Sequence, residues 1–269
     1  LRPRLKAPMR LFRHSDPGFA QAFEAFVHER RETPAAVDEV VREVIARVRS
    51  EGLSALLELS ARFDKTPVTE ANIRVTEAEI EAGYAACPED VREAIRFAAS
   101  RIRTYHERQK PADQSWTDEA GVGLGWRWTP LEAVGIYVPG GRAAYPSSLL
   151  MNAIPARVAG VERLVVVTPT PKGQINPLVM AAAHLAGVDE VWRIGGAQAV
   201  AALAYGTQRI APVDVITGPG NAWVAEAKRQ LYGVVGIDMV AGPSEILVIA
   251  DGQNDPDWIA ADLLSQAEH

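Results

Sequence analysis

The chain has 269 residues, 48% of them hydrophobic, and a formal net charge of -6 at pH 7. This length and apolar content allow a substantial core and two domains. Basic residues are interspersed with acidic ones, which excludes nucleic acid as the main partner, and no apolar run approaches the roughly 18 residues of a membrane span.

The first part of the chain, up to about Trp128, is typical of helices. Apolar residues recur at helical spacing in three segments, residues 37–48, 53–59 and 91–105. We interpret these stripes as core-facing. The single cysteine, Cys87, excludes an internal disulfide and is interpreted as a small apolar side chain rather than a catalytic thiol. A reducing, cytoplasmic setting is therefore expected.

Three tryptophans mark the end of this helical part. Trp116, Trp126 and Trp128 bracket the glycines of residues 121–125, which predicts a hairpin or an irregular strand pair. Their aromatic cluster could stack on a base, but the anchoring of one domain on another is the favoured interpretation.

From Ala133 the pattern changes to short apolar runs that alternate with alanine-rich helical stretches. The predicted strands are residues 134–138, 164–167, 191–194 and 213–216, and the predicted helices are residues 146–158, 178–186, 197–204 and 221–231. These units predict a mostly parallel sheet covered on both faces. A further strand over residues 245–250 and an amphipathic helix over residues 255–269 follow.

Three turns after the predicted strands carry polar side chains that could face a ligand. Tyr137 precedes Pro-Gly-Gly, so its ring could pack on a nucleotide, with an ordinary βα turn as the alternative. Gln198 follows a Gly-Gly pair at a helix start, where free N–H groups and the helix dipole favour a phosphate or other polar ligand. Tight helix–sheet packing explains those glycines equally well. Asn221 ends a Gly-Pro-Gly-Asn turn as the natural N-cap of the next helix, and a capping asparagine at the carboxyl end of a strand can also face a ligand.

Two later segments present a hydroxyl and a possible ligand pair. The Gly-Pro-Ser turn at residues 242–244 exposes the Ser244 hydroxyl and backbone N–H groups. Gln266 and His269 lie three residues apart on one helix face, as two ligands of one ion would. A Gln-x-x-His pair without further context is more often an exposed helix face than a metal site.

Taken together, these segments resemble the histidinol dehydrogenase family. The resemblance rests on four motifs: Asp-Met-Val-Ala-Gly-Pro-Ser-Glu at 238–245, Gly-Pro-Gly-Asn at 218–221 with Val-Ala-Glu-Ala-Lys at 224–228, Tyr-Val-Pro-Gly-Gly at 137–141, and Asp-Leu-Leu-Ser-Gln-Ala-Glu-His at 262–269. Four motifs in the right order make chance agreement implausible. The resemblance implies a cytoplasmic, zinc-dependent enzyme of histidine biosynthesis that oxidises L-histidinol through L-histidinal to L-histidine while reducing two NAD.

The resemblance also implies roles for six residues: NAD contacts for Tyr137, Gln198 and Asn221, a substrate contact for Ser244, and zinc and substrate contacts for Gln266 and His269. The family's catalytic glutamate–histidine pair and two further zinc ligands match positions after residue 269. We therefore expect the chain to be the N-terminal part of a longer enzyme, without a catalytic residue of its own and inactive as given. Relatives are homodimers, so the full-length protein is expected to be one.

The expected fold class is α/β, with two Rossmann-like domains, mostly parallel sheets and a helical N-terminal region. Residues 1–132 are expected to form the helical part of the first domain, residues 133–243 an inserted NAD-associated domain, and residues 244–269 the return to the first. Two alternatives stay open: an NAD-dependent dehydrogenase of another small alcohol, such as sulfopropanediol, and a non-catalytic NAD- or metal-binding fragment. A general aldehyde dehydrogenase is disfavoured, because Cys87 has no activating context.

Overall fold

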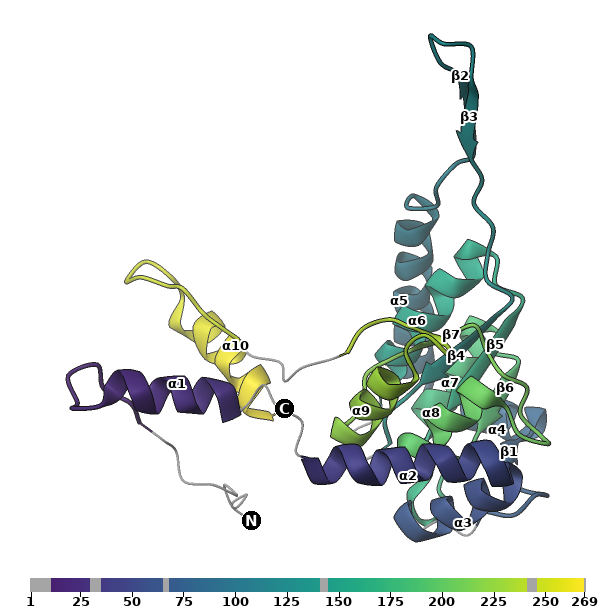
Figure 1. Cartoon of the computed structure of the whole chain (residues 1–269), viewed down its shortest axis with the longest axis horizontal. Helices are drawn as coiled ribbons and strands as arrows, with labels where there is room; N and C mark the ends of the chain where they lie inside the picture. Colours follow the sequence, from purple (N-terminus) through teal and green to yellow (C-terminus); the bar gives the residue numbers. More distant parts are fainter. Residues whose placement is uncertain (1–10, 30–34, 65–67, 141–144, 241–245, 269) are drawn as a thin grey trace. The chain divides into compact units, whose positions relative to one another are not determined.

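The computed structural model describes residues 11–29, 35–64, 68–140, 145–240 and 246–268 (Figure 1). The chain divides into two compact units, one over Ala35–Ala241 and the other within Leu1–Pro34 and Gly242–His269. The smaller unit contains helices α1 (Phe19–Glu29) and α10 (Pro256–Glu268). Within the described ranges, no helix is both long enough and apolar enough to cross a membrane.

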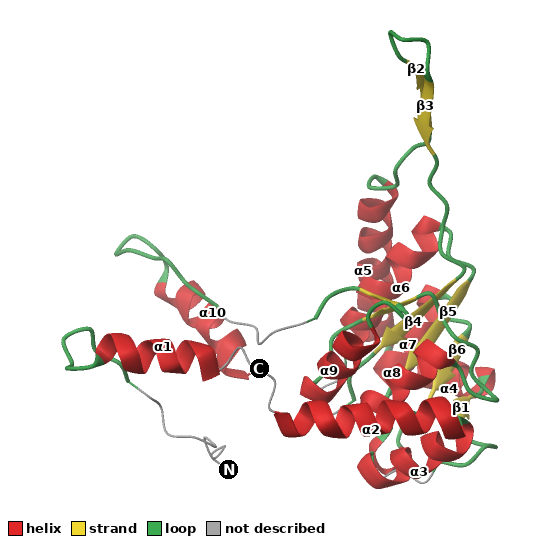
Figure 2. Cartoon of the chain, viewed as in Figure 1, coloured by secondary structure: helices red, strands yellow, loops and turns green. Residues whose placement is uncertain are grey.

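The larger unit is built around a six-stranded sheet with the strand order β1-β6-β5-β4-β7-β8. Figure 2 shows the strands of this unit in yellow among the red helices. Its strands are β1 (Arg74–Val75), β4 (Ala133–Tyr137), β5 (Arg163–Val167), β6 (Glu190–Trp192), β7 (Val215–Thr217) and β8 (Gly236–Ile237). The strands from β4 to β8 are parallel to their neighbours, with Val134 opposite Leu164 on one side and Val215 on the other. Only the edge strand β1 is antiparallel among the strands of this sheet. The α/β class and the mostly parallel sheet are therefore confirmed.

Helices cover both faces of this sheet, as Figure 1 shows. One core contains α2 (Ala35–Glu51), α3 (Leu53–Phe63), α8 (Gly196–Tyr205) and α9 (Ala222–Leu231), and the other contains α4 (Glu77–Ala86), α5 (Glu89–Glu107), α6 (Pro146–Ala159) and α7 (Pro177–Ala186). Successive strand residues alternate between the two cores: Val165 lies in the first and Val166 in the second. Burial on both faces explains why these strands are continuous apolar runs.

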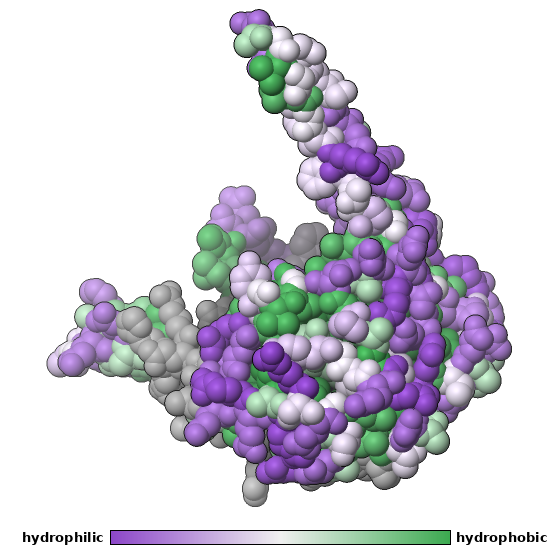
Figure 3. All heavy atoms as spheres, turned by 45° about the vertical axis from the view of Figure 1, so that its right-hand side comes forward, coloured by the Kyte–Doolittle hydropathy of each residue, from purple (hydrophilic) through white to green (hydrophobic). Residues whose placement is uncertain are grey.

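The predicted hairpin is confirmed as the antiparallel pair β2 (Gln114–Thr117) and β3 (Gly123–Trp126). Asp118 stabilises its turn, because its Oδ1 accepts hydrogen bonds from the backbone N–H groups of Ala120 and Val122. The rings of Trp116 and Trp126 meet edge to face with centroids 5.2 Å apart, and both stay partly exposed. The space-filling view shows an apolar patch near the free end of this hairpin (Figure 3). Domain anchoring by the tryptophans stays a prediction.

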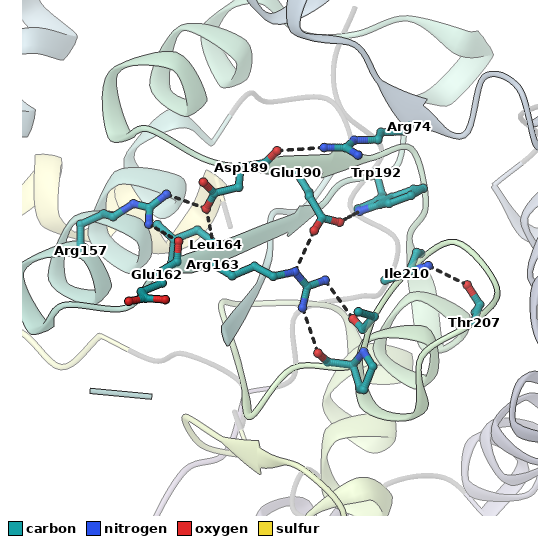
Figure 4. A network of polar contacts seen from close by, with 12 residues as sticks. Arg74, Arg157, Glu162, Arg163, Leu164, Asp189, Glu190, Trp192, Thr207 and Ile210 are labelled. Atoms are coloured by element: carbon teal, nitrogen blue, oxygen red, sulfur yellow. Dashed lines mark hydrogen bonds and ion pairs between the residues drawn. The ribbon is translucent and has the colours of Figure 1, made fainter. Parts of the chain in front are cut away.

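Charged side chains join the amino ends of β5 and β6 (Figure 4). Arg163 Nε donates to Glu190 Oε1 at 2.8 Å, and Glu190 Oε2 accepts from the indole N–H of Trp192 at 2.9 Å. Arg157 on α6 pairs with Asp189 at 2.6 Å. These contacts lie at the amino ends of the strands. The carboxyl ends of the strands, at the opposite end of the sheet, remain open to a ligand site.

The segment after the larger unit differs from the expected strand. Residues 246–250 form no strand, and Leu247 and Ile249 are 85% and 89% exposed. A strand needs neighbouring backbone to satisfy its N–H and C=O groups, and no described strand pairs with this segment. The expected strand is therefore wrong for residues 246–250.

The unit boundaries also bear on the expected domains. Residues 35–107, which were expected in the first domain, share a compact unit with the six-stranded sheet. A second Rossmann-like sheet is not found among the described residues. The expected division into two Rossmann-like domains, with boundaries after residues 132 and 243, stays a prediction.

Candidate functional site

A cavity of about 480 Å³ opens at the carboxyl ends of the parallel strands. Its walls come from α2, the end of α3, and the segments that follow β4, β5, β6 and β7; they include Val40, Val44, Phe63, Asp64, Tyr137, Pro139, Gly140, Pro169, Pro171, Gly196, Ala197, Gln198, Asn221 and Trp223. The strand order reverses beside β4, since β5 and β6 lie on one side and β7 and β8 on the other. Open α/β sheets bind ligands at such a switch point. Three sequence-predicted residues, Tyr137, Gln198 and Asn221, meet in this cavity.

The sequence predicts free backbone N–H groups at the start of α8, where they could bind a phosphate or another polar ligand. In the structure, the Gly196 N–H donates to the Tyr137 hydroxyl at 3.0 Å and the Gly195 N–H donates to Asp64 Oδ2 at 3.1 Å. Both N–H groups therefore have partners from within the chain, and the expectation that they are free for a phosphate is wrong for this pair. Packing explains Gly195 as well, because a Cβ there would lie 2.7 Å from Pro169 Cβ.

Asp64 is a site residue that sequence reasoning missed. Its Oδ2 also accepts a hydrogen bond from Gln198 Nε2 at 3.2 Å, and the Gln198 side chain is buried. Burial raises the pKa of the Asp64 carboxyl, although the hydrogen bonds from Gly195 and Gln198 act in the opposite direction. One local signal existed: Asp64 is the C-cap of α3, where the helix dipole disfavours a negative charge.

Tyr137 ends β4 with its side chain 3% exposed. Burial, with a smaller contribution from the charge of Asp64, raises the pKa of the phenol to about 12. The phenol is therefore neutral over the physiological range, and its oxygen accepts from Gly196. This fixed hydroxyl links the end of β4 to the start of α8.

Asn221 is positioned by the turn that follows β7. Gly218 has φ +107°, and a Cβ at this residue would lie 2.2 Å from the Tyr137 carbonyl oxygen, so glycine is required there. Asn221 Oδ1 accepts hydrogen bonds from the N–H groups of Trp223 and Val224, both at 3.1 Å. The N-cap interpretation is confirmed, and the same residue lines the cavity.

The remaining predicted site residues have side chains outside the described part of the chain. Ser244 and His269 lie outside the described residues, as does the side chain of Gln266, although the backbone of residue 266 belongs to α10. In the part of the chain that the structure describes, no group of three or more His, Cys, Asp or Glu side chains could hold a metal ion. The roles of these three residues stay predictions.

Comparison with known proteins gives one consistent result. The family model described as histidinol dehydrogenase matches residues 27–269. The histidinol dehydrogenase of Caulobacter vibrioides is 68% identical over 97% of this chain and 60% of its own length, and that of Cereibacter sphaeroides is 63% identical over 94% and 58%. The crystal structure of histidinol dehydrogenase from Elizabethkingia anophelis matches with a TM-score of 0.82 and 40% identity, over 87% of this chain and 54% of that one. The chain thus spans about 60% of the length of these curated relatives.

Proposed function

The chain belongs to the histidinol dehydrogenase family, and from this premise we propose that its gene product oxidises L-histidinol through L-histidinal to L-histidine with NAD and zinc. The observation that carries the proposal is the cavity at the switch point of the sheet. It gathers Tyr137, Gln198 and Asn221, which are the residues that match the family's NAD contacts.

The residues of the cavity suit a dinucleotide. Its volume of about 480 Å³ is in the range of small-molecule sites. Val44, Phe63 and Trp223 supply apolar walls that can pack on a planar ring, while Gln198 and Asn221 bring polar groups to the same space. When bound, NAD supplies the hydride acceptor for each oxidation. The side chains of this chain hold and orient it and exclude water.

The carboxylate of Asp64, at the end of α3, contacts the start of α8 and restricts which ligand groups can bind there. Asp64 already accepts from Gly195 and Gln198, so an anionic ligand group would compete for the same donors and be repelled by a like charge. A ribose hydroxyl or an amino group can instead donate to a carboxylate. We therefore place an uncharged part of NAD, rather than its diphosphate, beside Asp64.

The zinc part of the proposal rests on the resemblance. Gln266 and His269 offer an amide oxygen and an imidazole, and a zinc site takes about four ligands, so this pair supplies part of one. Zinc would orient the imidazole and amine of the substrate, with Ser244 as a further substrate contact. The acid–base pair matches positions after residue 269, so we propose that the 269 residues alone do not turn over. A cytoplasmic homodimer completes the proposal.

Calorimetric titration of the chain with NAD tests the cavity. Asn221→Ala is expected to weaken NAD binding. Thr76→Ala is the matched control, because Thr76 caps α4 in the same way but does not line the cavity. Each substitution removes a cap and costs about 1 kcal/mol of stability. Absence of NAD binding to the wild-type chain, or equal losses in the two variants, would contradict the assignment.

An activity assay separates the proposed function from its alternatives. The full-length gene product is expected to form NADH with L-histidinol and not with sulfopropanediol. Turnover of sulfopropanediol alone would indicate a dehydrogenase of another alcohol. NAD binding without turnover of either would indicate a non-catalytic binding protein.

A further inference from the structure

A buried lysine lies behind the turn that carries Asn221. Lys228, on α9, is 3% exposed, and its Nζ donates to the Gly218 carbonyl oxygen at 2.9 Å. The same ammonium forms an ion pair with Asp238 Oδ1. Neither residue lines the cavity, so neither is explained by direct contact with a ligand.

Asp238 closes the arrangement from the other side. Its Oδ2 accepts from the Gly218 N–H at 2.9 Å, and its Oδ1 accepts from the Met239 N–H at 2.7 Å. Its own N–H donates to Ile216 in β7 at 3.2 Å. Both backbone polar groups of Gly218 are therefore held by one ion pair.

Both contacts are made to Gly218, the first residue of the turn that carries Asn221. Gly218 has a positive φ and lies directly against the Tyr137 carbonyl, and Asn221 follows three residues later. Lys228 is buried and Asp238 is partly exposed, and an ion pair of this kind gives little net stability compared with apolar side chains of similar volume. Its contribution here is geometric, because two charged groups fix the donor and the acceptor of a single residue at positive φ.

We infer that Lys228 and Asp238 are positioning residues, which hold the Gly218–Asn221 turn in the conformation that binds the cofactor. The inference rests on the proposed NAD site. Helix α9 is anchored separately on α2, through Gln230 and Arg229 to Asp38 at 3.0 and 2.9 Å. Loss of the lysine contact should therefore free the turn without releasing the helix.

The test compares the Kd for NAD of each variant with its free energy of unfolding. Lys228→Met is expected to raise the Kd for NAD by about tenfold, because the turn loses a hydrogen bond from a charged donor. Arg229→Met is the control, because it removes two ion pairs from the same helix, to Asp38 and Glu226, without touching the turn, while Gln230 still anchors α9 on α2. Lys228→Arg, which keeps the charge, should restore part of the affinity. Urea unfolding of each variant shows whether a difference in Kd follows stability.

Asp238→Asn provides a second route if Lys228→Met does not fold. It is expected to weaken NAD binding, and to add little to the effect of Lys228→Met where both fold, because the two residues act as one unit. A folded Lys228→Met or Asp238→Asn variant with wild-type affinity would overturn the inference, as would an equal loss in Arg229→Met. If the wild-type chain does not bind NAD, the proposed function fails together with the inference, and that result differs from all of these.

Discussion

Replacement of Asp64 tests the network at the start of α8. The Gly195 N–H and Gln198 Nε2 donate to the same oxygen, Oδ2, at 3.1 and 3.2 Å. Asp64→Ala removes this acceptor from both donors. A buried donor without a partner costs about 1–3 kcal/mol, and water can reach part of this site through the cavity. We therefore expect a loss of about 2–4 kcal/mol in the free energy of unfolding.

Asp64→Asn is the matched variant, because one amide oxygen can accept both bonds while the charge is removed. Burial raises the pKa of Asp64 in the folded protein. The stability that comes from protonation of Asp64 in the folded state is therefore fully present below the unfolded pKa of about 4. This part is lost as pH rises through the folded pKa. The Asp64→Asn variant is expected to lie within about 1 kcal/mol of wild type at neutral pH. Its stability should also change less between pH 4 and neutral pH than that of the wild type.

Urea unfolding monitored by circular dichroism at a series of pH values measures both effects. The reasoning is refuted if Asp64→Ala unfolds within about 0.5 kcal/mol of wild type, because the two donors would then not depend on this carboxylate. It is equally refuted if Asp64→Asn is as destabilised as Asp64→Ala. That result would show that charge, rather than the shared acceptor, holds the network together.

Three further predictions concern Gly218, Tyr137 and His269. Gly218→Ala should cost more than about 3 kcal/mol, because strain at positive φ adds to overlap with the Tyr137 carbonyl, whereas Gly187→Ala, with positive φ but open space, should cost about 1–2 kcal/mol by urea unfolding. Tyr137→Phe should cost about 1–2 kcal/mol, since it leaves the Gly196 N–H without its acceptor. The wild-type contribution of this phenol should fall as pH rises from about 10 to about 12, because the folded pKa is raised, and the Tyr137→Phe variant should lack that alkaline loss of stability. His269→Ala in the full-length protein should lower the zinc content measured by mass spectrometry, and an unchanged content would remove His269 from the proposed site.

The strands were predictable because burial on both faces leaves a clear pattern. Residues 164–167 were expected as a strand, and β5 covers Arg163–Val167 with its last four residues fully buried. The N-cap role of Asn221 was predictable for a related reason, since a cap depends on residues two and three positions away. Local or periodic features of this kind can be read from one sequence.

The partners at the start of α8 were not predictable in the same way. Asp64 lies 131 residues before Gly195, and no spacing rule connects a helix C-cap to a distant βα turn. The sequence showed two glycines at a helix start, but it did not show that a carboxylate and a phenol already accept from them. The strand expected at the end of the chain is wrong for residues 246–250 for a related reason. An apolar run predicts burial, whereas a strand also requires a neighbour to pair with.

The position of Tyr137 explains why the predicted residues meet although their partners were not foreseen. It ends β4, the strand beside which the strand order reverses, so its carbonyl oxygen faces the turn after β7 while its hydroxyl reaches the turn after β6. The topology alone brings these turns together, whatever side chains they carry. The two turns then share one residue, so substitutions at Tyr137 and in the turn after β7 should not have additive effects on NAD affinity. Gly218→Ala presses on the Tyr137 carbonyl and Tyr137→Phe removes the hydroxyl of the same residue, so additive losses for these two substitutions, measured singly and together, would show that the turns bind independently.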